Sequence, residues 1–125
     1  MAFSTDVLRI DVSGVAEAIE GAIRQQVRFL RRRGAVVGLS GGIDSSVVTC
    51  LCARALGAAR VQVLLMPERD SSSDALTLGR LLTTALGVPA LVEDITPVLE
   101  AAGCYRRQVE AIRTVCPEYG DGYRC

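Results

Sequence analysis

Residues 38–46 combine glycines, hydroxyl groups and one carboxylate in a pattern that suits phosphate chemistry. They read GLSGGIDSS and follow an apolar run that is typical of a buried strand. Gly41 and Gly42 have no Cβ atom, so their backbone can adopt unusual conformations and approach a ligand closely. If a helix begins just after them, its unpaired N–H groups and its dipole attract an anion. The segment therefore predicts an anion-binding loop, to which its serines add hydroxyl donors.

Asp44 narrows the kind of anion that this loop can bind. A carboxylate here repels a bare phosphate, so it makes sense only if a divalent cation bridges it to phosphate oxygens. We therefore expect a magnesium–nucleotide site with Asp44 on the metal. The loop is not a Walker P-loop, because the chain contains no lysine. It is not the dinucleotide fingerprint either, because Ser40 stands where the second glycine after Gly38 is required.

The composition excludes several other kinds of active site. The chain has no histidine, which removes Ser–His and Cys–His pairs, His metal ligands and imidazole bases. No side-chain nucleophile is expected, and no catalytic residue is assigned. The cysteines are odd in number and irregularly spaced, which predicts reduced thiols, although a thiol-transfer role for Cys104 and Cys116 stays open. The five cysteines are Cys50, Cys52, Cys104, Cys116 and Cys125.

The charge balance argues against highly charged partners, and the lengths of the apolar runs argue for a particular location. All 14 basic residues are arginines, and 14 acidic residues bring the formal net charge to zero, so nucleic acid and anionic membranes are not favoured. The sequence shows neither a run long enough to cross a bilayer nor a secretory signal, so a cytoplasmic protein is expected. Residues 31–33 are three arginines that most simply complement a helix dipole; a phosphate-contacting patch is the alternative. Tyr105, Arg106 and Arg107 are interpreted as part of a surface helix.

Apolar periodicity predicts helices that alternate with short strands. This alternation is typical of an α/β protein with a parallel sheet. Ser13 is expected to cap the first helix and Gly34 to stop it, and the second helix is expected to direct Val47, Val48, Leu51, Cys52 and Ala55 inward. The predicted helices span residues 15–30, 44–56, about 78–85, 96–103 and 105–115, and the predicted strands span residues 35–39, 60–65 and 90–93.

The strand at residues 35–39 is expected to be buried on both faces. Three strands are few for such a sheet, and a glycine-rich turn at residues 120–123 lies close to Cys125. We therefore expect one domain over residues 1–125 that forms the N-terminal part of a longer unit and is incomplete at its C-terminus.

The SGGIDS loop (Ser40–Ser45) is similar to the SGGxDS signature of the ATP pyrophosphatases, which cleave ATP between its α and β phosphates. Within that group, residues 36–87 most resemble the NAD synthetases, particularly the synthetase domain of the glutamine-using form, because Met66-Pro67 and three serines (residues 71–73) follow the second strand. Taken alone, Met66-Pro67 is only a strand end. Ser71 and Asp74 alone have the spacing of a helix cap.

The resemblance implies a three-layer, Rossmann-like fold of the adenine nucleotide alpha hydrolase type. It also implies that ATP and Mg²⁺ bind at the loop, with Asp44 on the metal, and that the end of the second strand borders the adenine. The implied ATP-binding residues are Gly38, Leu39, Ser40, Gly41, Gly42, Ile43, Asp44, Ser45, Leu65 and Met66.

The activity that the resemblance implies is an AMP-forming, amide-forming ligase. ATP would adenylylate the carboxylate of deamido-NAD, and ammonia would then displace AMP to give NAD. Only 39 residues stand before Ser40, so no glutaminase domain is expected ahead of the loop, and ammonia would come free or from a separate glutaminase. A homodimer through the helix at residues 15–30 is a further expectation. The alternatives are another ATP pyrophosphatase, acting on a nucleobase, a tRNA or a sugar acid, and a non-catalytic ATP-binding module.

Overall fold

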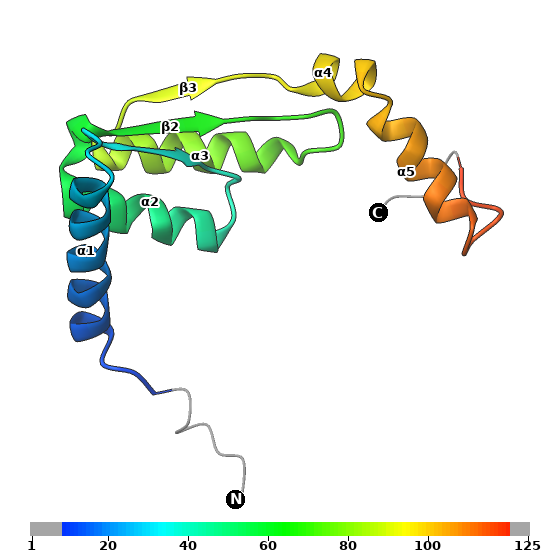
Figure 1. Cartoon of the computed structure of the whole chain (residues 1–125). Helices are drawn as coiled ribbons and strands as arrows, with labels where there is room; N and C mark the ends of the chain where they lie inside the picture. The colour runs from blue at the N-terminus through cyan, green and yellow to red at the C-terminus, as the bar shows by residue number, and fades with distance from the viewer. Residues whose placement is uncertain (1–8, 121–125) are drawn as a thin grey trace, which may run out of the picture.

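The computed structural model describes residues 9–120, so Cys125 and most of the predicted turn at residues 120–123 lie outside the described residues. Three parallel strands form an open sheet in the order β1-β2-β3, and helices alternate with them (Figure 1). This arrangement confirms the predicted α/β class. The strands are β1 (Ala35–Gly38), β2 (Val61–Leu65) and β3 (Ala90–Val92). The helices are α1 (Val12–Phe29), α2 (Ile43–Leu56), the 3-10 turn η2 (Ala58–Arg60), α3 (Ser73–Leu86), α4 (Thr96–Ala101) and α5 (Cys104–Arg113).

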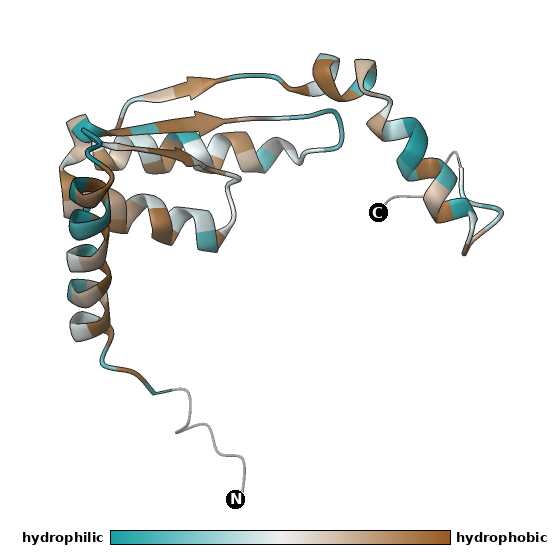
Figure 2. Ribbon diagram, viewed as in Figure 1, coloured by the Kyte–Doolittle hydropathy of each residue, from teal (hydrophilic) through white to brown (hydrophobic). Residues whose placement is uncertain are grey.

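The core lies between the sheet and the pair of helices α2 and α3. Every second residue of β2 points into it: Val61, Val63 and Leu65 are at most 2% exposed. Figure 2 shows hydrophobic residues along β2, and its buried residues pack with Cys52 of α2 and with Leu76, Leu82 and Leu86 of α3. α3 approaches the sheet closely at Gly79, where a Cβ atom would lie 2.5 Å from Leu65 Cδ2. A small residue at this position therefore sets the distance between helix and sheet.

The opposite face of the sheet is open in the described part of the chain. Val36 is 67% exposed and Leu91 is 54% exposed, so the prediction that the first strand is buried on both faces is wrong. The reason is topological. Right-handed crossovers that move in one direction along the sheet, from β1 to β2 to β3, place both crossover helices on the same face. Accordingly α2 and α3 lie on one side of the sheet in Figure 1.

α1 packs against α2 at the amino end of the strands (Figure 1). Glu20, which is 8% exposed, forms an ion pair of 2.8 Å with Arg54 of α2. The helical spacing of Val15, Ile19, Ala22, Ile23, Val27 and Leu30 predicts one buried face, and this prediction is wrong for most of these residues because α1 lies beyond the sheet. Val15 and Ile19 are 41% exposed, and only Ile23 of the six packs against the core. The others of that predicted face, including Leu30, which is 58% exposed, lie outside the core cluster.

Both predicted ends of α1 need correction. Asp11, rather than Ser13, is the N-cap, and its Oδ1 accepts a hydrogen bond of 3.2 Å from the Gly14 N–H. At the other end the helix stops before Gly34, at Phe29. Arg31 there has a φ of 52°, a left-handed conformation that glycine usually takes after a helix.

The inner face of α2 is built from Thr49, Cys52 and Ala55. The predicted inward positions of Val47 and Val48 are wrong, since these side chains are 50% and 48% exposed. Thr49 can be fully buried because its hydroxyl donates to the Ser45 carbonyl at 2.7 Å. The two cysteines of this helix are two residues apart and differ in burial: Cys52 is buried, which raises the pKa of its thiol, and Cys50 is partly exposed.

α4 and α5 form an arm beyond the carboxyl ends of the strands (Figure 1). α4 begins at Thr96, whose N–H donates a 2.9 Å hydrogen bond to Asp94 Oδ1, while the N-cap residue Ile95 offers no side-chain cap. Hydrogen bonding with Thr96 also lowers the pKa of Asp94. The arm is fastened to the loop after β2: the Tyr105 hydroxyl donates to Glu68 at 2.8 Å, and the Arg69 guanidinium lies 3.7 Å above the Tyr105 ring.

No helix among residues 9–120 is both long enough and apolar enough to span a membrane.

The contrast between the two sheet faces gives a first prediction. Val63→Ala removes two buried methyl groups and should lower the free energy of unfolding by about 2 kcal/mol. Val36→Ala is the matched control on the open face and should cost less than about 0.5 kcal/mol. Chemical denaturation followed by circular dichroism measures both variants. An equal loss in the two would show that the outer face of β1 is covered in solution.

Candidate functional site

The SGGIDS loop connects the carboxyl end of β1 to the start of α2. Leu39 anchors the entry to the loop: it is 4% exposed, and its N–H donates to the Leu64 carbonyl at 2.9 Å. Gly42 is the N-cap of α2, and no described side chain caps this helix. The N–H groups of the first turn of α2 therefore point out of the helix end without a side-chain partner, which is the arrangement that binds anions.

Gly41 has two separate reasons to be glycine. Its φ is +80°, in the left-handed region that side chains disfavour. In addition, a Cβ atom here would lie 2.6 Å from the Ala75 carbonyl oxygen and 2.7 Å from the Ala75 Cα. The loop is thus pressed against the first turn of α3, and this contact brings the amino ends of α2 and α3 to one edge of the sheet.

The serines of the loop hold its shape. The Ser45 hydroxyl accepts from the Ser40 N–H at 3.2 Å and lies 3.0 Å from the Ser40 hydroxyl. The Ser46 hydroxyl donates to the Gly42 carbonyl at 2.7 Å. The Ser45 hydroxyl also donates to the Gly42 carbonyl, at 3.2 Å, so both serines of the first turn of α2 direct a proton to the backbone. The Ser40 hydroxyl lies beside this network, which a phosphate oxygen could join.

Asp44 is exposed in the first turn of α2. Among residues 9–120 no group of three or more His, Cys, Asp or Glu side chains is placed to hold a metal ion. One carboxylate fits the chemistry of a magnesium–nucleotide complex, because Mg²⁺ commonly takes one or two carboxylates and completes its shell with phosphate oxygens and water.

A small cleft of about 100 Å³ adjoins the loop at the carboxyl ends of β1 and β2. It brings predicted residues of the loop together with both predicted residues at the end of β2, at the edge where ligands bind in open α/β sheets. Pro67 belongs to the Met66-Pro67 pair on which the resemblance depends, whereas Ala75 and Leu76 carried no sequence signal of their own. The lining residues are Leu39, Ser40, Leu65, Met66, Pro67, Ser71, Ser72, Ala75 and Leu76. Small-molecule sites usually measure about 300–1,000 Å³, so this cleft encloses only part of a nucleotide.

The serines after β2 divide between two structural roles. Ser72 is the N-cap of α3, and its Oγ accepts from the Ala75 N–H at 3.2 Å. Ser71 Oγ instead accepts from the Glu68 N–H at 3.1 Å. The sequence spacing of Ser71 and Asp74 predicted a helix cap at Ser71. This prediction is wrong by one residue, because the cap is Ser72.

Comparison with known proteins supplies the decisive observation. The family model of NAD synthase matches residues 15–115, which include β1, the SGGIDS loop, α2, β2 and the cleft. The chain belongs to the NAD synthase family. The resemblance of residues 36–87 to the NAD synthetases is thereby confirmed, and the match extends over most of the chain.

Individual relatives agree with this assignment. The NH3-dependent NAD+ synthetase of Mesorhizobium japonicum is 57% identical over 120 residues, covering 95% of this chain and 38% of the relative. That of Rhizobium meliloti is 51% identical, covering 98% and 37%. The solved NH3-dependent NAD synthetase from Campylobacter jejuni, in complex with the nitrate ion, is 33% identical with a TM-score of 0.71, covering 78% of this chain and 42% of that one. This structural likeness confirms the Rossmann-like fold, and the chain spans less than two-fifths of these curated relatives.

The geometry of the loop gives a second prediction. Gly41→Ala combines an unfavourable φ with a close contact to Ala75 and should lower the free energy of unfolding by about 1–3 kcal/mol. Gly42→Ala is the neighbouring control: its φ is −82°, and its nearest atom would be Ser40 Oγ at 3.5 Å. This control should cost at most about 1 kcal/mol in thermal or chemical unfolding, because alanine is a poorer N-cap than glycine. Equal effects at the two glycines would contradict the contact between the loop and α3.

Proposed function

We propose that the SGGIDS loop holds the phosphates of ATP in an AMP-forming, amide-forming reaction of the NAD synthetase type. The observation that carries the proposal is the uncapped amino end of α2, directly behind a loop that has the family's signature. The N–H groups of this turn and the helix dipole supply positive potential that costs no reorganisation when charge develops on a leaving group.

The reaction that fits this arrangement is adenylylation followed by amidation. A carboxylate oxygen of deamido-NAD forms a bond to the α-phosphorus of ATP, the bond between the α-phosphorus and the bridging oxygen breaks, and pyrophosphate leaves. Ammonia then attacks the acyl carbon, loses a proton and displaces AMP, which gives the amide. Neither step requires a side-chain nucleophile, so the protein contributes mainly positioning and charge stabilisation. This explains how a chain without histidine or lysine can serve the reaction.

Asp44 is proposed to hold Mg²⁺ from the first turn of α2, and the bound cation would neutralise charge on the departing phosphates. The residues proposed to surround the ATP phosphates are Gly38 to Ser45, and Leu65 and Met66 are proposed to border the adenine. Support comes from the cleft, which joins Leu39 and Ser40 of the loop to Leu65 and Met66.

Free ammonia is proposed as the nitrogen source. Two relatives that are 57% and 51% identical to this chain are named NH3-dependent NAD+ synthetases. These names favour free ammonia over a separate glutaminase and over the glutamine-using form that the sequence resembled. We also propose a homodimer through α1, supported by the exposed Val15 and Ile19. A cytoplasmic location is proposed because it suits this chemistry and an odd number of cysteines.

A second candidate function is nucleotide binding without turnover by this chain alone. It is favoured by the small volume of the cleft, about 100 Å³, together with the 38% of a relative's length that the chain spans. In this case ATP binds at the same loop, but the site for the acceptor substrate requires residues that do not belong to this chain.

A third prediction tests the role of Asp44. Release of AMP and pyrophosphate from MgATP should require both deamido-NAD and ammonia, and Asp44→Ala should reduce it at least about a hundredfold, because the metal contact contributes several kcal/mol. Asp74→Ala is the matched control, an exposed carboxylate in the first turn of α3, and should retain the parent's rate.

Calorimetric titration with MgATP separates the two candidate functions. ATP binding without turnover supports the module, and turnover with the full mixture supports the ligase. Pyrophosphate release that persists in Asp44→Ala would contradict the assignment of Asp44, and absence of ATP binding would contradict both functions.

A further inference from the structure

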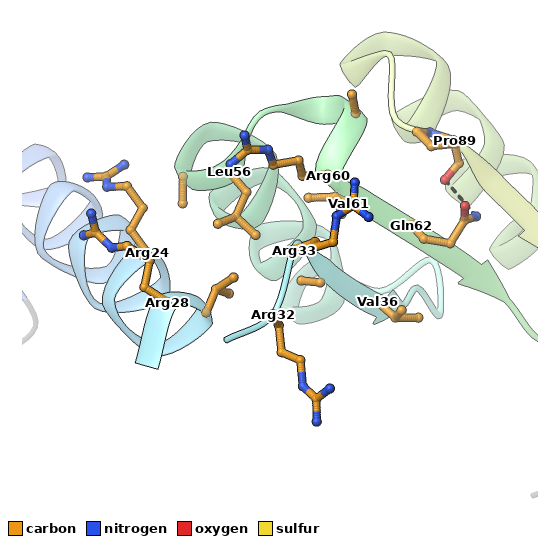
Figure 3. Close-up of a pocket in the computed structure, with 15 residues that line it drawn as sticks. Arg24, Arg28, Arg32, Arg33, Val36, Leu56, Arg60, Val61, Gln62 and Pro89 are labelled. Atoms are coloured by element: carbon orange, nitrogen blue, oxygen red, sulfur yellow. Dashed lines mark hydrogen bonds between the residues drawn. The ribbon is translucent and has the colours of Figure 1, made fainter. Parts of the chain in front are cut away.

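A cavity of about 770 Å³ lies at the amino ends of the strands, at the opposite end of the sheet from the SGGIDS loop (Figure 3). The last turns of α1 form one side, and η2 with the start of β2 forms the other. Pro89 closes the far edge, where its carbonyl accepts a 3.2 Å hydrogen bond from Gln62 Nε2. This volume lies within the range of about 300–1,000 Å³ that is usual for small-molecule sites.

Arginine side chains dominate the charge of this cavity, which we call the arginine cavity. None of its lining residues is acidic, although the chain as a whole carries equal numbers of acidic and basic residues. The positive charge is therefore local to this end of the molecule. The five arginines that line the cavity are Arg24, Arg28, Arg32, Arg33 and Arg60.

Most of these arginines have no neutralising partner within the part of the chain that the structure describes. Arg24 forms a 3.7 Å ion pair with Glu20, whereas the other four form no ion pair with any residue between 9 and 120. In Figure 3, Arg24 and Arg28 extend from α1, Arg33 and Arg60 lie across the cavity from them, and Arg32 points away. Unpaired guanidinium groups around a concave surface focus a positive potential inside it.

The backbone between α1 and the cavity wall adopts an unfavourable conformation. After α1 the chain turns sharply: the Arg31 N–H donates to the Arg28 carbonyl and the Arg32 N–H to the Val27 carbonyl, both at 2.9 Å. This is the hydrogen-bond pattern of a helix end that normally has glycine in the left-handed position, yet Arg31 occupies it with a φ of 52°.

The next residues pack directly on η2. Gly34 touches the Arg60 backbone so closely that a Cβ atom would overlap the Arg60 carbonyl. The contact brings Arg33 and Arg60 to the same wall of the cavity, where two like charges repel each other unless an anion lies between them. Strain and like-charge proximity that persist in a fold are typical of a binding site.

We propose that the arginine cavity binds a small organic molecule that carries two or more phosphate groups, such as a nucleoside diphosphate. Guanidinium groups bind phosphate oxygens in bidentate geometry, and the half-buried apolar side chains of Val27 and Leu56 can contact an uncharged part of the ligand. Nucleic acid is the less suitable occupant, because the site is concave and the chain has zero net charge. This site shares no lining residue with the SGGIDS loop, so it is independent of the function proposed above.

The test is a titration of the isotopically labelled chain with ADP in magnesium-free buffer, followed by amide chemical shifts. Saturable shifts are expected at Gly34, Ala35 and Gln62. The double variant Arg33→Gln/Arg60→Gln should weaken ADP binding at least about tenfold, because hydrogen bonds to charged groups are the strong ones. The control Arg80→Gln/Arg107→Gln removes the same charge from two exposed residues that do not line the cavity and should weaken ADP binding less than about threefold.

Arg28→Gln is a second variant that alters only an exposed side chain of α1, and a loss of ADP affinity there supports the proposal if the double variant does not fold. Shifts confined to the SGGIDS loop, or an equal loss in the control pair, would overturn it. Tighter binding of a thymidine oligonucleotide than of ADP, abolished by the same variants, would also overturn it and assign the surface to nucleic acid.

Discussion

The contact between Gly41 and the first turn of α3 is the constraint on which the site depends. Because Gly41 adopts a positive φ and presents no Cβ atom, the loop after β1 can lie directly against Ala75. This contact places the uncapped amino end of α2 beside the capped amino end of α3, at the carboxyl edge of the sheet. Parallel pairing of β1 with β2 supplies the other half of the geometry, since it aligns Gly38 with Leu64 and so brings Leu65 and Met66 next to the loop.

Much of this arrangement could be predicted from the sequence because its signals are local. The strand–SGGIDS–helix succession, Gly87 as the left-handed residue after α3, and the alternation of helices and strands all depend on a few neighbouring residues. The family resemblance depended on the same short segments. Whether Asp44 binds a metal, and which atoms contact ATP, stay predictions, because the structure contains the protein alone.

The errors have a common physical origin in tertiary context. The apolar residues of α1 have helical spacing, but spacing does not reveal that this helix lies beyond the sheet and is fastened by the Glu20–Arg54 ion pair instead. The exposure of Val36 follows from both crossover helices lying on one face, which the sequence of elements does not specify. Thr49 is buried because its hydroxyl donates to a backbone carbonyl, and a polar residue type alone does not indicate such burial.

The two ends of the sheet offer two different solutions to anion binding. At the carboxyl end, backbone N–H groups and a single carboxylate suit a metal-bound phosphate; at the amino end, guanidinium groups suit a phosphate without a metal. The most direct test of the account is paramagnetic broadening of amide signals by the manganese complex of ATP, which reports distance from the metal. The account predicts that signals of residues 41–45 broaden first and that Asp44→Ala abolishes the effect. Broadening centred on Gly34 and Gln62, or bound nucleotide without broadening near Asp44, would contradict it.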